Sequence, residues 1–198
     1  LAKNAAHLVK NQAFIIPNYS WWGGPFYLIG LSIYDMLAGK LSIGKTKYLG
    51  KKSTKNLLSN IKEKNLQSGV LYHDGQFDDS RLAINLMQSA IENNACLVNY
   101  TKVIGLLKSE SGKLNGVVVK DTISGKTYEV KGKAIVNATG VFTDDILNMN
   151  NPNHKKTVVP SQGIHLVLDK SFLPQDDAIM IPKTSDGRVL FVVPWHDK

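Results

Sequence analysis

The spacing of apolar residues along the chain predicts a mixture of helices and short strands. Apolar side chains recur at helical spacing after Phe26, at residues 29, 33, 36 and 37, which predicts a helix that ends at Gly39. A second helix is predicted to begin at Asp78-Asp79-Ser80, because carboxylates are favoured at the positive end of the helix dipole, and to end near Asn93-Asn94. Shorter apolar runs predict strands at residues 14–16, 95–100, 134–136, 164–168, 178–181 and 189–193.

Two glycine-containing turns divide the middle of the chain into a predicted β-meander. Its strands would be residues 103–108, 114–121 and 127–130. The strand at 134–136 then leads directly into Asn137-Ala138-Thr139-Gly140, and a helix is predicted over residues 143–149. Small residues at the carboxyl end of a strand let a ligand approach the backbone closely, so this turn is the first candidate site. Taken alone, it also fits an ordinary strand-to-helix turn.

Composition and cysteine content are those of a soluble globular protein. Hydrophobic residues make up 43% and charged residues 20% of the 198 residues. Cys96 is the one cysteine, so the chain can form no internal disulfide, and its apolar surroundings predict a buried strand residue rather than a nucleophile. A reducing compartment fits this composition. No apolar run is long enough to span a bilayer.

The formal net charge of +8 is concentrated in a lysine-rich stretch between residues 40 and 64. Such a charge can favour nucleic acid, an anionic membrane surface or a phosphorylated substrate. Few aromatic residues interleave with the lysines and no nucleic-acid motif is present, so we interpret the stretch as an exposed connector with a short helix over residues 54–64. No nucleic-acid partner is predicted.

The acidic residues do not predict a metal site. Asp74, Asp78 and Asp79 are explained by turn formation and helix capping. Asp144 and Asp145 belong in the first turn of the helix predicted after Gly140.

The collinear arrangement of several segments is more specific than any one of them. This chain contains, in order, a predicted helix, a strand, a meander and a strand ending in Ala138-Thr139-Gly140. Two-dinucleotide-binding flavoproteins use the same order. Four further segments resemble FAD-dependent glycerol-3-phosphate dehydrogenases and oxidases in order and spacing: residues 69–82 (GVLYHDGQFDDSRL), 137–144 (NATGVFTD), 159–166 (VPSQGIHL) and 186–195 (DGRVLFVVPW). Residues 14–17 and 30–35 also resemble that family, so the resemblance covers essentially the whole chain.

This resemblance implies a reaction and a set of site residues. The reaction is oxidation of sn-glycerol 3-phosphate at its secondary alcohol to dihydroxyacetone phosphate, with hydride transfer to FAD and electrons passed to a quinone acceptor, or to oxygen in the oxidase branch. Ala138, Thr139 and Gly140 correspond to cofactor contacts, and the backbone of Val103 corresponds to an adenine contact. Arg188 matches the arginine that holds the substrate phosphate, a role suited to its forked donors.

His165 is the candidate catalytic residue. It follows Ser161-Gln162-Gly163 in a predicted strand, and the resemblance places it near the substrate pocket. A lone strand histidine is also commonly a packed, hydrogen-bonded residue, and both interpretations stay open.

The chain also departs from the family pattern. It contains no Gly-x-Gly-x-x-Gly, which the family has upstream as the pyrophosphate cradle, and it stops at residue 198, where family members continue. We therefore predict an interior fragment that holds FAD only as part of the full-length protein and is inactive by itself, because hydride transfer needs flavin and alcohol carbon held together.

The predicted fold is α/β with α+β. Residues 66–150 would form the second part of a two-dinucleotide-binding, Rossmann-like FAD domain with its β-meander. Residues 1–65 and 154–198 would form a substrate domain on an antiparallel sheet, so residues 14–16 are expected to pair with a late strand. The breaker Asn150-Asn151-Pro152-Asn153 separates the last two segments.

Two alternatives remain at this point. Another FAD-dependent amine or hydroxy-acid oxidoreductase of the same superfamily would share the meander and Ala138-Thr139-Gly140 but need not have a phosphate-binding arginine at position 188. A short non-catalytic binding protein is the second alternative. The predicted location is the cytoplasm, and the positive charge is compatible with peripheral docking at the inner face of the cytoplasmic membrane.

Overall fold

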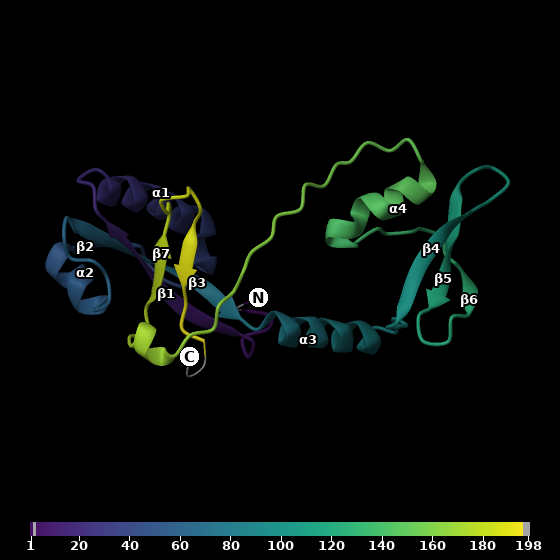
Figure 1. Ribbon diagram of the computed structural model, residues 1–198. Helices are drawn as coiled ribbons and strands as arrows, with labels where there is room; N and C mark the ends of the chain where they lie inside the picture. Colours follow the sequence, from purple (N-terminus) through teal and green to yellow (C-terminus); the bar gives the residue numbers. More distant parts are fainter. Residues whose placement is uncertain (2, 196–198) are drawn as a thin grey trace. The chain divides into compact units, whose positions relative to one another are not determined.

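The computed structural model describes residues 1 and 3–195, which fall into two compact units (Figure 1). The first unit combines Leu1–Leu86 with the chain from Leu166 onward, and the second unit is Met87–His165. Each unit is described by itself.

The first unit is built on a five-stranded sheet in the order β2-β3-β1-β7-β8. Its strands are β1 (Val9–Asn18), β2 (Lys47–Gly50), β3 (Ser68–Phe77), β7 (Ala178–Ile181) and β8 (Leu190–Val192). The central strand β1 runs antiparallel to β3 along its whole length and parallel to β7, where Phe14 lies opposite Ala178. The predicted pairing of residues 14–16 with a late strand is therefore confirmed, but the sheet is mixed rather than wholly antiparallel.

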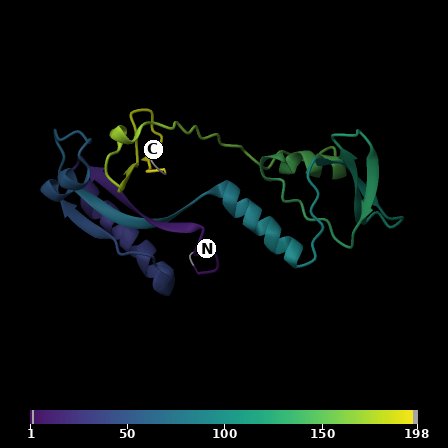
Figure 2. The same ribbon diagram turned by 90° about the horizontal axis from the view of Figure 1, so that it is seen from below.

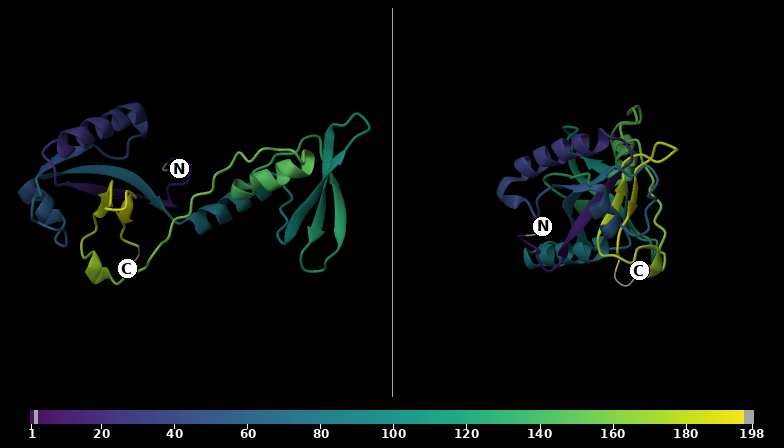
Figure 3. Two further views of the ribbon diagram at one scale, coloured as in Figure 1. Left: turned by 45° about the horizontal axis from the view of Figure 1, so that its top comes forward. Right: turned by 90° about the vertical axis from the view of Figure 1, so that its left-hand side faces the viewer.

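Both faces of this sheet are covered, and the alternation of side chains along β1 supplies both cores. Phe14 and Ile16 point to one face, where they pack with Tyr72 and with the helix α1 (Gly23–Ala38), which lies along β3 (Figure 3). Ile15 points to the opposite face and packs with Leu58, which follows the helix α2 (Lys51–Leu57).

Helix α1 forms where it was predicted and ends at Gly39, whose φ of 52° favours glycine. The apolar residues that predicted it point away from the sheet, however: between 48% and 79% of the surface of Ile29, Ile33, Met36 and Leu37 is exposed. The packed side is formed instead by Gly23, Gly24, Tyr27 and Leu31. Because α1 is apolar on nearly every side, periodicity identifies the helix but not the face that packs.

The lysine-rich stretch contains more structure than the sequence indicated. It includes the edge strand β2, which was not predicted, and α2 ends at Leu57 instead of extending to residue 64. The strand at 14–16 does not stop at Pro17 but continues to Asn18. Strand β3 pairs with β1 over ten residues, so residues 68–77 lie in the first unit, whereas the predicted domain boundary fell at residue 65.

The second unit begins within helix α3 (Asp79–Glu92), which continues the chain after β3 (Figure 2). The predicted cap is confirmed, because the Asp78 carboxylate accepts the Arg81 N–H at 3.0 Å. None of the residues in α3 is buried, including the apolar ones. The meander follows as β4 (Thr101–Lys108), β5 (Leu114–Asp121) and β6 (Thr127–Lys131), with positive-φ glycines at the two predicted turns. Helix α4 (Thr143–Asn150) packs against β4.

Three predicted strands are wrong. Residues 95–100, 134–136 and 164–168 form no strand, and Val98, Val136 and Ile164 are largely exposed. Cys96 is also exposed rather than buried. Each run has the composition of a strand, but no neighbouring strand among the described residues satisfies its backbone N–H and C=O groups.

Candidate functional site

The turn at residues 137–143 is fixed by hydrogen bonds that its own side chains form within the turn. Asn137 donates from Nδ2 to the Thr143 carbonyl at 3.0 Å and accepts the Thr139 hydroxyl at 2.8 Å. Thr143 in turn donates its hydroxyl to the Gly140 carbonyl at 2.8 Å. A short 3₁₀ helix, Gly140–Phe142, continues directly into α4. The first N–H groups of such a helical start have no helical partner and can face an anion.

Gly140 makes this turn open to a ligand. Its φ of 58° lies in the left-handed region that favours glycine, and a Cβ placed there would meet no atom within 4 Å. Ala138 and Thr139 are also exposed, so the structure brings three predicted cofactor residues into one accessible turn. The fourth, Val103, is half-buried in β4, opposite Val119 and beside an irregularity in the pairing.

Arg188 lies in the first unit, in the turn between β7 and β8. The Thr184 N–H donates to the Arg188 carbonyl at 2.8 Å, and Gly187 closes the turn with a φ of 83°. The guanidinium binds Asp186 through Nε at 2.7 Å and through a terminal nitrogen, and these contacts, with the Thr184 hydroxyl, lower the pKa of Asp186. The Arg188 side chain is 80% exposed, so the remaining N–H donors of its fork are accessible.

His165 is exposed and lies in the extended segment that leaves the second unit. It has no hydrogen-bond partner within residues 1 and 3–195. The structure thus does not favour a packed, hydrogen-bonded role for this histidine in the chain.

Asp144 has a role that the sequence did not reveal. Its residue is 7% exposed, and its carboxylate accepts the Val158 N–H at 2.9 Å, the Thr157 hydroxyl at 2.7 Å and the Thr157 N–H at 3.1 Å. Nε2 of His154 lies 2.9 Å from the same carboxylate. Asp145, the neighbouring carboxylate in the same helical turn, is exposed. Nothing in the sequence separates these two residues.

The hydrogen bonds from Val158, Thr157 and His154 hold the pKa of Asp144 well below its ordinary value, although burial acts in the opposite direction. A carboxyl whose pKa is lower in the folded state stabilises that state fully above its unfolded pKa, and this contribution is lost as pH falls through the folded pKa. The stabilisation that the Asp144 carboxylate contributes is therefore fully present at neutral pH.

Two kinds of feature are absent from residues 1 and 3–195. No group of three or more His, Cys, Asp or Glu side chains there could hold a metal ion. None of the helices in residues 1 and 3–195 is long and apolar enough to cross a membrane.

Comparison with known proteins decides the family. Residues 29–198 match the family described as FAD dependent oxidoreductase. The chain belongs to this family. It is 37% identical over 207 residues to the mitochondrial glycerol-3-phosphate dehydrogenase of Schizosaccharomyces pombe, and the match covers 100% of the chain and 32% of the relative. The chain therefore spans about a third of that relative's length.

Solved structures give the same result. The glycerol-3-phosphate dehydrogenase of Bacillus halodurans, complexed with FAD, matches 99% of the chain with a TM-score of 0.76 and 25% identity, and the match covers 34% of that structure. The L-proline dehydrogenase of P. horikoshii matches 98% of the chain and 51% of that structure with a TM-score of 0.67. At 17% identity, this second likeness shows the fold alone. The predicted resemblance and the predicted α/β fold class are confirmed.

Proposed function

We propose that the full-length protein containing this chain oxidises sn-glycerol 3-phosphate to dihydroxyacetone phosphate, with hydride transfer to FAD. The observation that carries this proposal is the 37% identity to a glycerol-3-phosphate dehydrogenase across the whole chain. The likeness to an FAD-complexed glycerol-3-phosphate dehydrogenase over 99% of the chain supports the same reaction.

The residues of the second unit fit one part of a flavin site. The bound flavin would accept the hydride. The open turn at Ala138, Thr139 and Gly140 would let its backbone approach the cofactor, and the helical start behind it would face negative charge. Val103 would contact the adenine through its backbone. In this proposal the second unit contributes to the cofactor domain, and the first unit, which includes β3, contributes to the substrate domain.

The substrate would be held by its phosphate and oxidised at its secondary alcohol. Arg188 would bind the phosphate with the guanidinium donors that Asp186 leaves free. His165 would lie at the alcohol as the candidate catalytic residue, since an imidazole can take up a proton near neutral pH. The proposed electron acceptor is a quinone.

These assignments are tested by the reaction of the full-length protein. With sn-glycerol 3-phosphate and a water-soluble quinone, we expect dihydroxyacetone phosphate and reduced quinone to form in equal amounts. L-Proline and other amino acids should give no product. Turnover of an amine in place of glycerol 3-phosphate would favour the alternative oxidoreductase of the same superfamily.

The 198-residue chain by itself is expected to contain no stoichiometric FAD and to show no dehydrogenase activity. Residues 95–100 and 134–136 have no strand partners in the described part of the chain, so no sheet is completed behind Gly140. Flavin content measured by absorbance after gel filtration, beside the full-length protein, checks this expectation. A yellow, stoichiometric flavoprotein made from these residues alone would contradict it.

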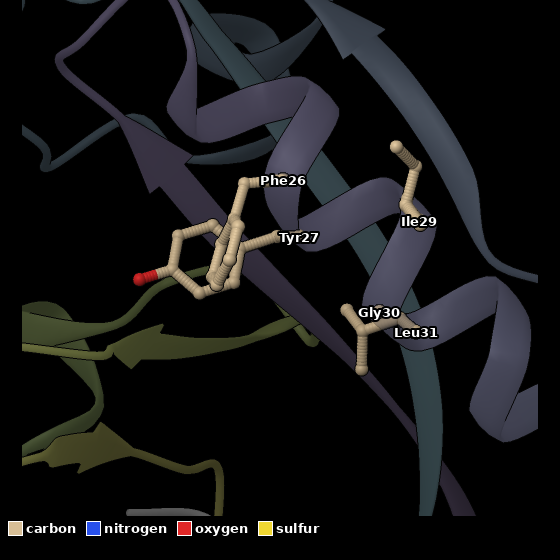
Figure 4. Close-up of a pocket in the computed structure, with 5 residues that line it drawn as sticks. All are labelled: Phe26, Tyr27, Ile29, Gly30 and Leu31. Carbon is tan, nitrogen blue, oxygen red and sulfur yellow. The ribbon is translucent and has the colours of Figure 1, made fainter.

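The membrane surface is the proposed partner of the outer side of α1. That side exposes the apolar residues Phe26, Ile29, Ile33, Met36 and Leu37. A hollow beside it is lined by Phe26, Tyr27, Ile29, Gly30 and Leu31 (Figure 4). Lysines follow it in the chain from Lys40 onward, as expected for a surface that meets anionic headgroups. The proposed site of docking is the inner face of the cytoplasmic membrane; the fission yeast relative is named mitochondrial.

Vesicle binding checks this proposal. The full-length protein should co-sediment with anionic phospholipid vesicles, and Ile29→Asp or Leu37→Asp should abolish most of that binding, because each places a charge on the apolar surface. Ile123→Asp is the matched control, since Ile123, in the turn after β5, is as exposed as Leu37. Unchanged binding of the α1 variants would show that this side of α1 does not meet lipid.

A further inference from the structure

We propose that Asp144 is a positioning residue, which holds the segment after α4 so that residues 159–165 are placed for the reaction. This inference rests on the proposed function for its enzymatic part. Asp144 lies four residues after Gly140 and one after Thr143, whose hydroxyl and carbonyl fix the candidate cofactor turn. One short piece of helix therefore fixes both the turn and the segment that follows.

The segment has few other attachments. Its remaining hydrogen bonds within residues 152–165 are local, from the backbone N–H groups of Asn153 and His154 to Asn151. From Val159 to Leu168 the chain is extended and forms no strand pairing in the described structure, and Val159 is 90% exposed. The direction in which the chain leaves toward Ser161 and His165 is thus set where Thr157 and Val158 meet Asp144.

The carboxylate of Asp144 uses both of its oxygens in these contacts. Oδ2 accepts two backbone N–H groups, those of Thr157 and Val158, while Oδ1 accepts the Thr157 hydroxyl and contacts His154. An asparagine has one acceptor oxygen and one NH₂ group. With that NH₂ group at the Oδ1 position, asparagine donates to the Thr157 hydroxyl and to Nε2 of His154 and still accepts both backbone N–H groups. The substitution that removes the contacts is therefore Asp144→Ala.

The test compares Asp144→Ala with Asp145→Ala in the full-length protein. Asp145 is the matched control, because it lies in the same helical turn and is exposed. Hydrogen exchange should show faster exchange of the Thr157 and Val158 amides in Asp144→Ala only. The kcat per bound FAD for glycerol 3-phosphate should fall roughly 10- to 100-fold, the effect of a misplacement of about 1 Å, with a much smaller change in KM.

The outcomes separate positioning from general stability. A variant that is only less stable would bind less FAD but turn over normally per bound flavin, and this result would overturn the proposal. Unchanged exchange at Thr157 and Val158 would also overturn it. If Asp144→Ala does not fold, Thr157→Val removes the hydroxyl contact alone and should lower kcat per flavin to a smaller extent; normal turnover would count against the proposal. If the wild-type protein does not oxidise glycerol 3-phosphate, the proposed function fails, while the exchange data still decide the role of Asp144.

Discussion

Replacing Arg188 by alanine in the full-length protein is expected to raise KM for sn-glycerol 3-phosphate roughly 10- to 100-fold, the loss of about 1.5–3 kcal/mol of charge-assisted hydrogen bonding. The effect falls on KM because the phosphate is remote from the alcohol that reacts and is bound before and during the reaction. Arg188→Lys should recover only part of the loss, since an ammonium group cannot make the bidentate contact of a guanidinium. Steady-state kinetics over a range of substrate concentrations measure all three proteins.

The chain contains one other arginine, Arg81, and it supplies the control. Arg81 is exposed on α3 and its backbone N–H forms the helix cap, so Arg81→Ala removes the same charge and keeps that hydrogen bond. It should leave KM unchanged. Equal KM values for wild-type protein and Arg188→Ala would remove Arg188 from the substrate site.

Gly140→Ala is expected to weaken FAD binding roughly 10- to 100-fold, equivalent to the loss of one or two charge-assisted hydrogen bonds to the cofactor. The added methyl group would meet no protein atom within 4 Å and would occupy the open space beside the turn, where the proposal places the cofactor. The change also strains the backbone by about 1–2 kcal/mol, because φ is 58° at this position. FAD binding to the apoprotein, followed by fluorescence, measures the effect.

Substitutions at Gly112 and Gly125 distinguish the effect of backbone strain from the loss of a cofactor contact. Both have positive φ, at 77° and 74°, and a Cβ at either would also meet open space. Gly112→Ala and Gly125→Ala in the meander turns should therefore carry the same backbone cost of about 1–2 kcal/mol without a change in FAD affinity. If all three variants weaken FAD binding equally, the turn at Gly140 has no particular role in holding the cofactor.

The elements that sequence predicted well are those whose signals are local. The meander was predicted almost residue for residue, since Gly112 and Gly125 each mark a tight turn between alternating strands. The cap at Asp78 is likewise formed by neighbours in the chain. Local chemistry alone is enough in such cases.

The errors arise where the outcome depends on a distant partner. Residues 95–100 and 134–136 have the composition of strands, but a strand forms only beside another strand, and composition does not reveal whether one is present. The same reason explains β3, whose ten-residue pairing with β1 crosses the predicted domain boundary. For α1, an almost wholly apolar helix gives no contrast from which the packed face could be chosen.

The candidate site shows the same division. The exposed turn at Ala138, Thr139 and Gly140 was predicted from a strand, small residues and a following helix, while Arg188 and Val103 came from the family resemblance. Asp144 could not be found by either route. Its partners Thr157 and Val158 lie 13 and 14 residues away in a segment without regular structure, and only the fold distinguishes it from Asp145.

Anaerobic reduction of the flavin tests the central claim most directly, because it needs no electron acceptor and no membrane. The full-length protein containing this chain should purify with FAD, and adding sn-glycerol 3-phosphate without oxygen should bleach the flavin absorbance and yield one dihydroxyacetone phosphate per flavin. L-Proline should leave the spectrum unchanged. A flavin that stays oxidised with glycerol 3-phosphate, or is bleached by an amine instead, would contradict the account.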